Sequence, residues 1–156
     1  MSKLPEELIA LLHDTGSIKV IATIDGAGHP HVVVKGSLTT LDNETIVFAE
    51  GLEGSLSNKN LVRSIWFDKK VAITITKGLT SYQVKGRPYK YLITGSLFRQ
   101  FLDRARERRG AEADIAGVWV ITPEEVRNES PAVRSSLARE ERGLFHSHLD
   151  LLRHSE

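Results

Sequence analysis

Short segments in which apolar residues fall at every second position recur along residues 18–121, and this pattern restricts the possible folds most strongly. Successive side chains of a β-strand point to opposite faces of a sheet, so a period of two predicts strands with one buried face. Residues that favour turns separate the segments, which indicates an antiparallel meander. The predicted strands are 18–24, 29–36, 46–49, 71–76, 81–86, a segment that begins at residue 89 after a break at Arg87 and Pro88, and 115–121.

Three further stretches have the spacing of amphipathic helices. The first follows Pro5 and ends at Thr15 and Gly16. The second begins at Ser57, a residue suited to cap a helix, and the third begins near residue 97. The residues expected to face inward are Leu61, Val62 and Ile65 in the second helix, and Leu97, Phe98, Phe101, Leu102 and Ala105 in the third.

The chain after the last predicted strand is expected to be helical. Thr122 and Pro123 end that strand, and Glu124 and Glu125 suit a following helical turn because carboxylates are favoured at a helix start. Residues 130–156 are predicted to form a helical extension that packs on the same domain. Six or seven short strands, with helices at the start, middle and end, predict a mainly β fold, an antiparallel barrel with peripheral helices.

Size and composition exclude several classes of protein. The chain has 156 residues, enough for one buried core and too few for two ordinary domains. Its formal net charge of +1 gives no general attraction to nucleic acid or to membranes, so neither is an expected partner. It has no cysteine, which excludes disulfides and thiolate catalysis, and it has no apolar run of membrane-spanning length. We therefore expect a cytoplasmic protein whose redox chemistry, if present, uses a bound cofactor.

The region 30–61 contains the groups that a phosphate site needs. Lys35 follows an apolar strand, and Ser37 lies two residues later on the same face. A loop rich in glycine and serine then supplies Ser55 and Ser57 before a helix. A cation, hydroxyl groups and the N–H groups at a helix start together bind a dianionic phosphate. The region therefore predicts a binder of a phosphorylated ligand, and the alternative is an exposed strand end beside an ordinary helix cap.

Histidine pairs and a basic run have competing interpretations. His29 and His31 share one strand face, and His146 and His148 repeat this spacing near the C-terminus, with His154 beyond. No third ligand stands at a recognisable spacing, which favours surface histidines, so no metal site is predicted. Carboxylates at helical spacing accompany the arginines of residues 104–109, which favours a solvated helix face over a nucleic-acid patch. Aromatic residues that can stack on a planar ligand or belong to the core are Trp66, Tyr82, Tyr89, Tyr91 and Trp119.

In the order of these elements the chain resembles the pyridoxamine 5′-phosphate oxidase-like family of FMN-binding split barrels. The resemblance covers about residues 4–129. It implies a six-stranded antiparallel split barrel, Greek-key-like, in residues 1–129, followed by the helical extension at 130–156. It also implies a homodimer with FMN in grooves at the subunit interface. The segments that carry it are SIKVIATIDGAGHPHVVVKGS, TIVFAEGLEGSLSNKNLVRSIWFDKKVAITI, YQVKGRPYKYLITG and GVWVITPEEVRNES.

The resemblance also implies where the cofactor binds. The family's phosphate contacts come from the end of the second strand and from the loop before the short helix. Backbone groups line the flavin ring, and in this sequence they are expected to be those of Val33, Val34, Ala49 and Glu50. In this sequence Leu56 takes the place of a basic residue beside Ser57, and the basic C-terminal pattern that binds pyridoxamine 5′-phosphate is not found. That vitamer is therefore expected to be a poor substrate. The expected cofactor contacts are Val33, Val34, Lys35, Ser37, Ala49, Glu50, Ser55, Ser57, Asn58, Lys59 and Gln83.

These observations predict an FMN-binding flavoprotein, and a flavin-dependent oxidoreductase of the reductase type is the favoured activity. No side chain stands out as an obligatory acid or base, so no catalytic residue is predicted. The alternatives left open are a non-enzymatic flavin carrier or electron-transfer protein, and a relative that binds a deazaflavin or haem. The sequence indicates neither the substrate nor the electron donor.

Overall fold

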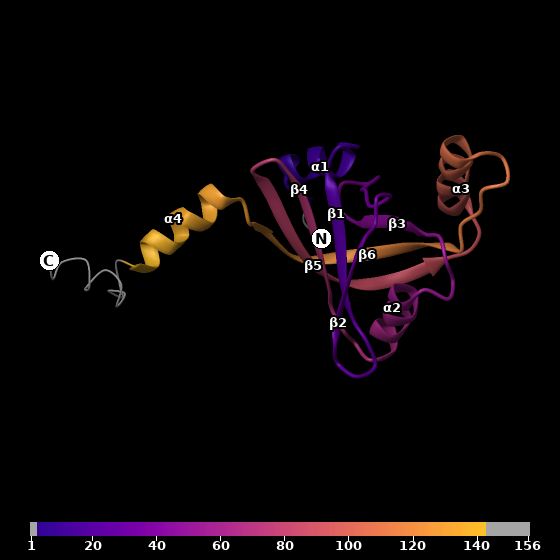
Figure 1. Cartoon of the computed structure of the whole chain (residues 1–156), viewed down its shortest axis with the longest axis horizontal. Helices are drawn as coiled ribbons and strands as arrows, with labels where there is room; N and C mark the ends of the chain where they lie inside the picture. The colour runs from indigo at the N-terminus through magenta and orange to yellow at the C-terminus, as the bar shows by residue number, and fades with distance from the viewer. Residues whose placement is uncertain (1–2, 143–156) are drawn as a thin grey trace, which may run out of the picture.

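The computed structural model describes residues 3–142, which form six strands and four helices (Figure 1). Helix α1 spans Glu6–His13, and strands β1, β2 and β3 span Ile18–Ile24, Pro30–Val34 and Ile46–Glu50. Helix α2 spans Leu56–Trp66, and strands β4 and β5 span Val71–Lys77 and Thr80–Leu92. Helix α3 spans Ser96–Arg109, strand β6 spans Gly117–Asn128, and helix α4 spans Pro131–Arg142.

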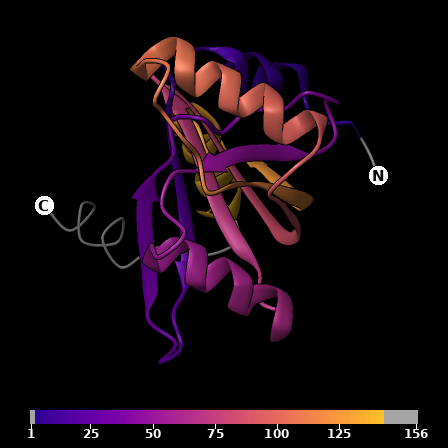
Figure 2. The ribbon, with the colours of Figure 1, turned by 90° about the vertical axis from the view of Figure 1, so that its right-hand side faces the viewer.

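The six strands form one antiparallel sheet in the order β2-β1-β4-β5-β6-β3. The sheet curls, and β2 and β3 are its two edge strands (Figure 2). The mainly β split-barrel fold class is therefore confirmed. The prediction of a simple meander is wrong, because β3 does not pair with its sequence neighbour β2 and pairs with β6 instead. Because of this pairing, β2 and β3 lie at opposite edges of the sheet.

The inner face of the curled sheet and helix α1 form the main core. Leu8 and Leu12 of α1 are fully buried against inward residues of the strands, such as Ile73 and Phe48. A second cluster lies on the outer side of β3 and β6, where α3 covers the sheet with Phe101 and Leu102. Strand β6 is therefore buried on both faces along part of its length, which explains its unbroken apolar run Val118–Ile121.

Two strands continue where the sequence predicted that they end. Strand β5 continues through Arg87 and Pro88, because register shifts against β6 on either side of this pair accommodate the missing N–H group of proline. Glu124 and Glu125 lie within β6 and not in a helical turn. Gly86 lies at the first of these irregularities, where a Cβ atom would collide with the carbonyl oxygen of Thr122. The two strands thus approach each other more closely than a larger residue would permit.

The N-cap of helix α2 lies two residues earlier than predicted. It is Ser55, whose hydroxyl accepts a hydrogen bond from the backbone N–H of Asn58, so Ser57 lies inside the first turn. Of the residues predicted to face inward, Leu61 is buried, whereas Val62 and Ile65 are exposed. The helix therefore buries a narrower stripe than its sequence suggested.

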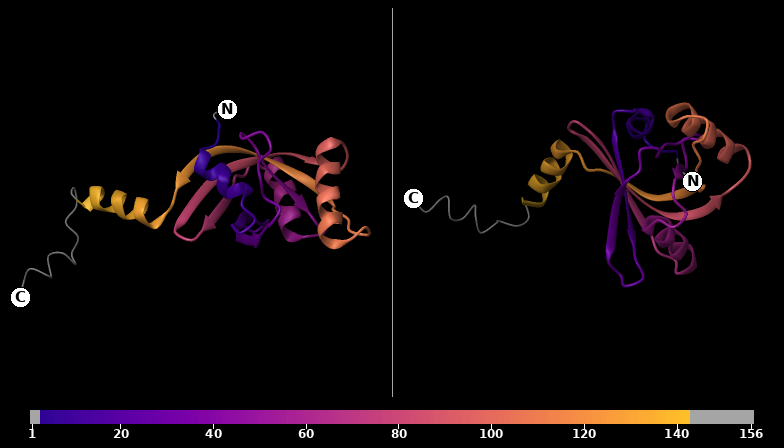
Figure 3. Two further views of the ribbon diagram at one scale, coloured as in Figure 1. Left: turned by 90° about the horizontal axis from the view of Figure 1, so that it is seen from above. Right: turned by 45° about the vertical axis from the view of Figure 1, so that its right-hand side comes forward.

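Helix α4 follows β6 and stands clear of the barrel in both views of Figure 3. Its side chains from Pro131 to Glu141 are exposed, apart from the half-buried Val133. Ser130, just before the helix, is held by the sheet, since its backbone and hydroxyl bond with Asn128 and Ser81. The division of the chain at residues 129 and 130 stays a prediction.

Candidate functional site

The end of β2 meets the end of β3 through a buried ion pair. The Lys35 ammonium lies 2.8 Å from Glu50 Oε2, and the two side chains are 15% and 2% exposed. Both side chains face the inside of the curled sheet, and Lys35 also lies over the ring of Phe48. An isolated charge at such depth is costly, so each residue is needed to stabilise the other.

A serine reinforces the same junction. The Ser37 hydroxyl accepts a hydrogen bond from the backbone N–H of Ala49 at 3.0 Å and lies 3.3 Å from the Ala49 carbonyl oxygen. We call these residues, Lys35, Ser37, Ala49 and Glu50, the seam, because they join the chain after one edge strand to the other edge strand. Four of the predicted cofactor contacts therefore lie together.

The start of α2 adjoins the seam. The Ser57 hydroxyl donates a hydrogen bond to Glu50 Oε2 at 3.3 Å and lies 3.2 Å from the hydroxyl of the N-cap residue Ser55. The first N–H groups of a helix precede its internal hydrogen-bond ladder, so they are available to an anion at this end. The predicted combination of a cation, hydroxyls and a helix start is thus assembled in one place.

Asn58 and Lys59 differ from this arrangement. Asn58 is buried, and its side-chain oxygen accepts a hydrogen bond from Trp119 Nε1 at 2.9 Å, while its amide group donates to the Glu53 carbonyl at 2.8 Å. Asn58 therefore fixes the loop before α2 to the core, a role that its sequence position did not reveal. Lys59 is exposed on the following position of the helix.

Residues Val34 and Gln83 lie on the opposite face of the sheet from Lys35. The strand register places Val34, Val20, Thr74 and Gln83 in one row across β2, β1, β4 and β5. The neighbouring position, Val33, faces inward with Lys35, since side chains alternate along a strand. Within one chain, Gln83 and Lys35 therefore do not converge on one point.

Tyr91 is a site residue that the sequence pattern identified only as an aromatic. Its ring stacks on Trp119 at a centroid distance of 4.7 Å, and its hydroxyl is buried with no hydrogen-bond partner among residues 3–142. Burial raises the pKa of this hydroxyl, and the charge of Glu50 raises it further. Gly117 lies against the ring, where a Cβ atom would collide with it. The neutral Tyr91 hydroxyl is therefore a potential hydrogen-bond donor beside the seam.

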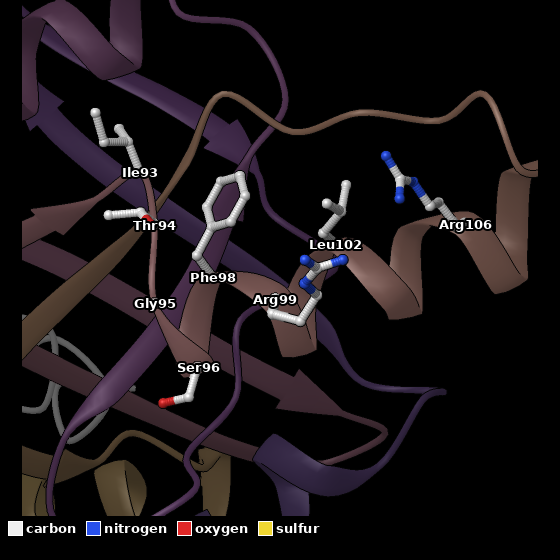
Figure 4. Close-up of a pocket in the computed structure, with 8 residues that line it drawn as sticks. All are labelled: Ile93, Thr94, Gly95, Ser96, Phe98, Arg99, Leu102 and Arg106. Atoms are coloured by element: carbon white, nitrogen blue, oxygen red, sulfur yellow. The ribbon is translucent and has the colours of Figure 1, made fainter.

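Other features of the described residues do not add to this site. A shallow cavity of about 590 Å³ adjoins the start of α3, and Figure 4 shows Phe98, Arg99 and Arg106 projecting from that helix around it. It contains none of the predicted contacts. Within residues 3–142, no three histidine or acidic side chains are grouped as metal ligands require, and no helix has the length and apolarity to cross a membrane. The histidines at 146, 148 and 154 lie outside the described residues.

Solved structures with the same fold come from several bacteria. The structure of HupZ from Group A Streptococcus is 21% identical, with a TM-score of 0.67, covering 82% of this chain and 95% of that one. A "putative pyridoxamine 5′-phosphate oxidase" from Lactobacillus delbrueckii is 26% identical, with a TM-score of 0.59, covering 80% and 93%. An FMN-binding protein from Syntrophomonas wolfei is 15% identical, with a TM-score of 0.62, covering 80% and 87%.

A structure called F420 reductase also matches, with 16% identity and a TM-score of 0.58, covering 80% of this chain and 98% of that one. No family model matches the sequence, and no curated protein matches it significantly. The likeness therefore lies in the arrangement of strands and helices, which these structures share over most of their length. The resemblance to the pyridoxamine 5′-phosphate oxidase-like family of split barrels is confirmed, and the chain has the fold of that family.

Proposed function

We propose that this protein binds FMN at the seam and the start of α2, and that it is a flavin-dependent oxidoreductase of the reductase type. The observation that carries the proposal is the position of Lys35 beside Ser57 and the first turn of α2. These groups fit a phosphate ester, because a cation, hydroxyls and helix N–H groups all favour a dianion. Bound FMN would supply hydride and electron transfer, and the protein would supply position and electrostatics.

Glu50 adds a constraint to this proposal. Its carboxylate already neutralises Lys35 and accepts from Ser57, and its second oxygen lies 3.3 Å from the backbone N–H of Leu52. A phosphate that approaches Lys35 therefore competes with a carboxylate for the same donors. The pair keeps the ammonium at the seam before the cofactor arrives, at some cost to phosphate affinity.

The first expected result is a preference for FMN over riboflavin. The two ligands differ only in the phosphate, so a site that reads phosphate binds FMN more tightly by about tenfold or more, the worth of a charge-assisted hydrogen bond. Fluorescence titration of the purified protein measures both affinities. The Lys59→Ala variant is the control, because Lys59 is exposed one position beyond Asn58 and is expected to change the ratio little. Equal affinities for FMN and riboflavin would remove the phosphate site from the proposal.

Two alternatives differ from the reductase in what the bound cofactor does. A non-enzymatic carrier would hold FMN without accelerating its turnover, and a deazaflavin-binding relative is favoured by the likeness to F420 reductase. Absorption spectra of the protein with FMN, with F420 and with haem identify the cofactor, because the three have distinct spectra. Steady-state oxidation of NADH and of NADPH in the presence of FMN is then measured, and accelerated oxidation of either donor would favour a reductase over a carrier.

A homodimer completes this proposal. The outer face of β1 and β2 exposes Val32 at 59% and Val34 at 68%, and Ile18 at 57% continues the apolar row. Such a patch on a sheet face is typical of an interface. The variant Val34→Asp is expected to be monomeric by light scattering at micromolar concentration and to lose FMN, whereas Leu79→Asp, on the exposed β4–β5 turn, is the matched control. A native monomer that still binds FMN would contradict a site built at the subunit interface.

A cytoplasmic location and the lack of a nucleic-acid or membrane partner remain predictions from composition.

A further inference from the structure

A second cavity, of about 840 Å³, lies on the other side of the seam from the start of α2. It is bounded by the end of α1, the start of β1, the chain after β2, and the second half of α3. We call it the α1–α3 cavity. Its volume falls in the range of sites for small organic ligands, about 300–1,000 Å³. The residues that line it and carry the argument are Ser17, Lys19, Ser37, Phe101, Arg104 and Arg108.

The charge of the α1–α3 cavity has one sign. Lys19, Arg104, Arg108 and Arg109 line it, and no carboxylate does. None of these four cations forms a salt bridge within the described part of the chain. Asp14, which follows α1, is paired with Lys77. A cavity lined by several cations that form no salt bridge has a positive potential that attracts anions.

Lys19 is the deepest of these cations. The residue is only 6% exposed, and its ammonium donates one hydrogen bond, of 2.7 Å, to the Leu12 carbonyl at the end of α1. Burial lowers the pKa of Lys19 and the nearby charge of Arg108 lowers it further, whereas the charge of Asp14 raises it by a smaller amount. A buried ammonium next to a second cation is unfavourable unless an anion compensates it. Two of its three donors are left for such an anion.

Ser17 provides a second and independent sign of a ligand. Its hydroxyl is buried, and it has no hydrogen-bond partner among residues 3–142. Buried hydroxyls in proteins are nearly always paired, so an unpaired one at a cavity wall indicates a group that a ligand satisfies. Ser17 and Lys19 are two residues apart, and both line the α1–α3 cavity.

Part of the remaining lining is apolar. Leu12, Leu38 and Phe101 are buried at its wall, and the guanidinium of Arg104 lies over the Phe101 ring at 5.5 Å. Inorganic anions need no such surface, whereas an organic anion buries its body there. We propose that the α1–α3 cavity binds a small molecule with an anionic head group, a phosphate or a carboxylate, on Lys19, Ser17 and Arg108, and with an apolar body against Phe101.

This site adjoins the proposed flavin site but has a different lining. The two regions share Ser37 and Ala49, but Lys35, Ser55 and Ser57 do not line the α1–α3 cavity. Because Ser37 and Ala49 belong to both regions, a ligand in the cavity contacts the seam. The proposal goes beyond FMN binding and does not depend on it.

Calorimetric titration with three aromatic probes tests the proposal: phenyl phosphate, benzoate and benzyl alcohol. Both anions are expected to bind at least about tenfold more tightly than the alcohol, the scale of one charge-assisted hydrogen bond. The tighter of the two anions identifies the head group. Amide shifts in ¹H–¹⁵N spectra should change at Ser17 and Lys19 and remain unchanged at Ser57.

Two variants test the named cations. Lys19→Met keeps the buried stem while removing the charge, and Arg108→Gln changes an exposed position that the fold does not need. Each should weaken phenyl phosphate by about tenfold. The matched control is Arg99→Gln, which removes an arginine from the same helix at a different cavity and should leave the affinity unchanged. Thermal unfolding by circular dichroism checks that each variant is folded.

Three results would overturn the proposal. The first is benzyl alcohol binding as tightly as the anions, and the second is equal weakening by Arg99→Gln and Arg108→Gln. The third is loss of phenyl phosphate binding when FMN is saturating, which would make the cavity part of the flavin site. If FMN does not bind the protein at all, the three titrations still decide the proposal, so its failure is distinguishable from failure of the proposed function.

Discussion

Replacing Lys35 with methionine is expected to lower the free energy of unfolding by about 3–5 kcal/mol, the cost of removing one partner from a buried ion pair. The loss arises because Glu50 is 2% exposed and would keep its charge without a cation. Ser57 would still donate to the carboxylate, but a hydroxyl does not neutralise it. Urea unfolding followed by circular dichroism, in the absence of added flavin, measures the change.

The double variant Lys35→Met, Glu50→Gln separates the ion pair from simple loss of packing. Because both charges are removed together, most of the lost stability should return. Lys59→Met is the control for the substitution itself and should stay within about 0.5 kcal/mol of the native protein, because Lys59 is exposed. If the single variant Lys35→Met unfolded like the native protein, the ion pair would not hold the two sheet edges together.

The second large effect is expected at Trp119. Its side chain is fully buried, and it contacts Tyr91 and bonds with Asn58. Trp119→Ala should cost about 3–5 kcal/mol in unfolding free energy, because it leaves a large cavity and also removes the donor to the Asn58 side-chain oxygen. Thermal or urea unfolding gives the value.

The chain provides its own matched control for this change. Trp66, the only other tryptophan in the sequence, is 78% exposed at the end of α2. Trp66→Ala should therefore change the unfolding free energy by no more than about 0.5 kcal/mol. Comparable losses in the two variants would show that Trp119 is not a core residue, and would remove the anchor that fixes the loop before α2.

The sequence predicted most of the strands and helices because their signals are local. Alternation identified β1 and β4, and the stripe through Phe101 and Leu102 identified α3 as a helix that covers a sheet. The misses have non-local causes. The pairing of β3 with β6 joins segments about 70 residues apart in the sequence, and no turn between them indicates it. The irregularities near Pro88 depend on the partner strand, so the proline alone suggested a break.

The candidate site was predictable in outline and not in detail. Residue types and spacing brought Lys35, Ser37 and Ser57 to one region, and the structure places them together. Glu50 was expected to contribute backbone groups only, and the structure gives its carboxylate the central position. Lys19 escaped notice and Tyr91 was identified only as an aromatic, because a single lysine or tyrosine within a strand carries no sequence signal of its surroundings. Their burial and missing partners appear only once the chain is folded.

Lys35 and Gln83 lie on opposite faces of one sheet, and this limits how a binding site that uses both side chains can be formed. If FMN contacts both side chains, as we propose, it takes one from each of two copies, and a dimer would then hold two such composite sites. A chain defective only in the Lys35 half and a chain defective only in Gln83 would then restore one intact site when mixed. Loss of binding would then depend on which two chains form the dimer, and not on either chain alone.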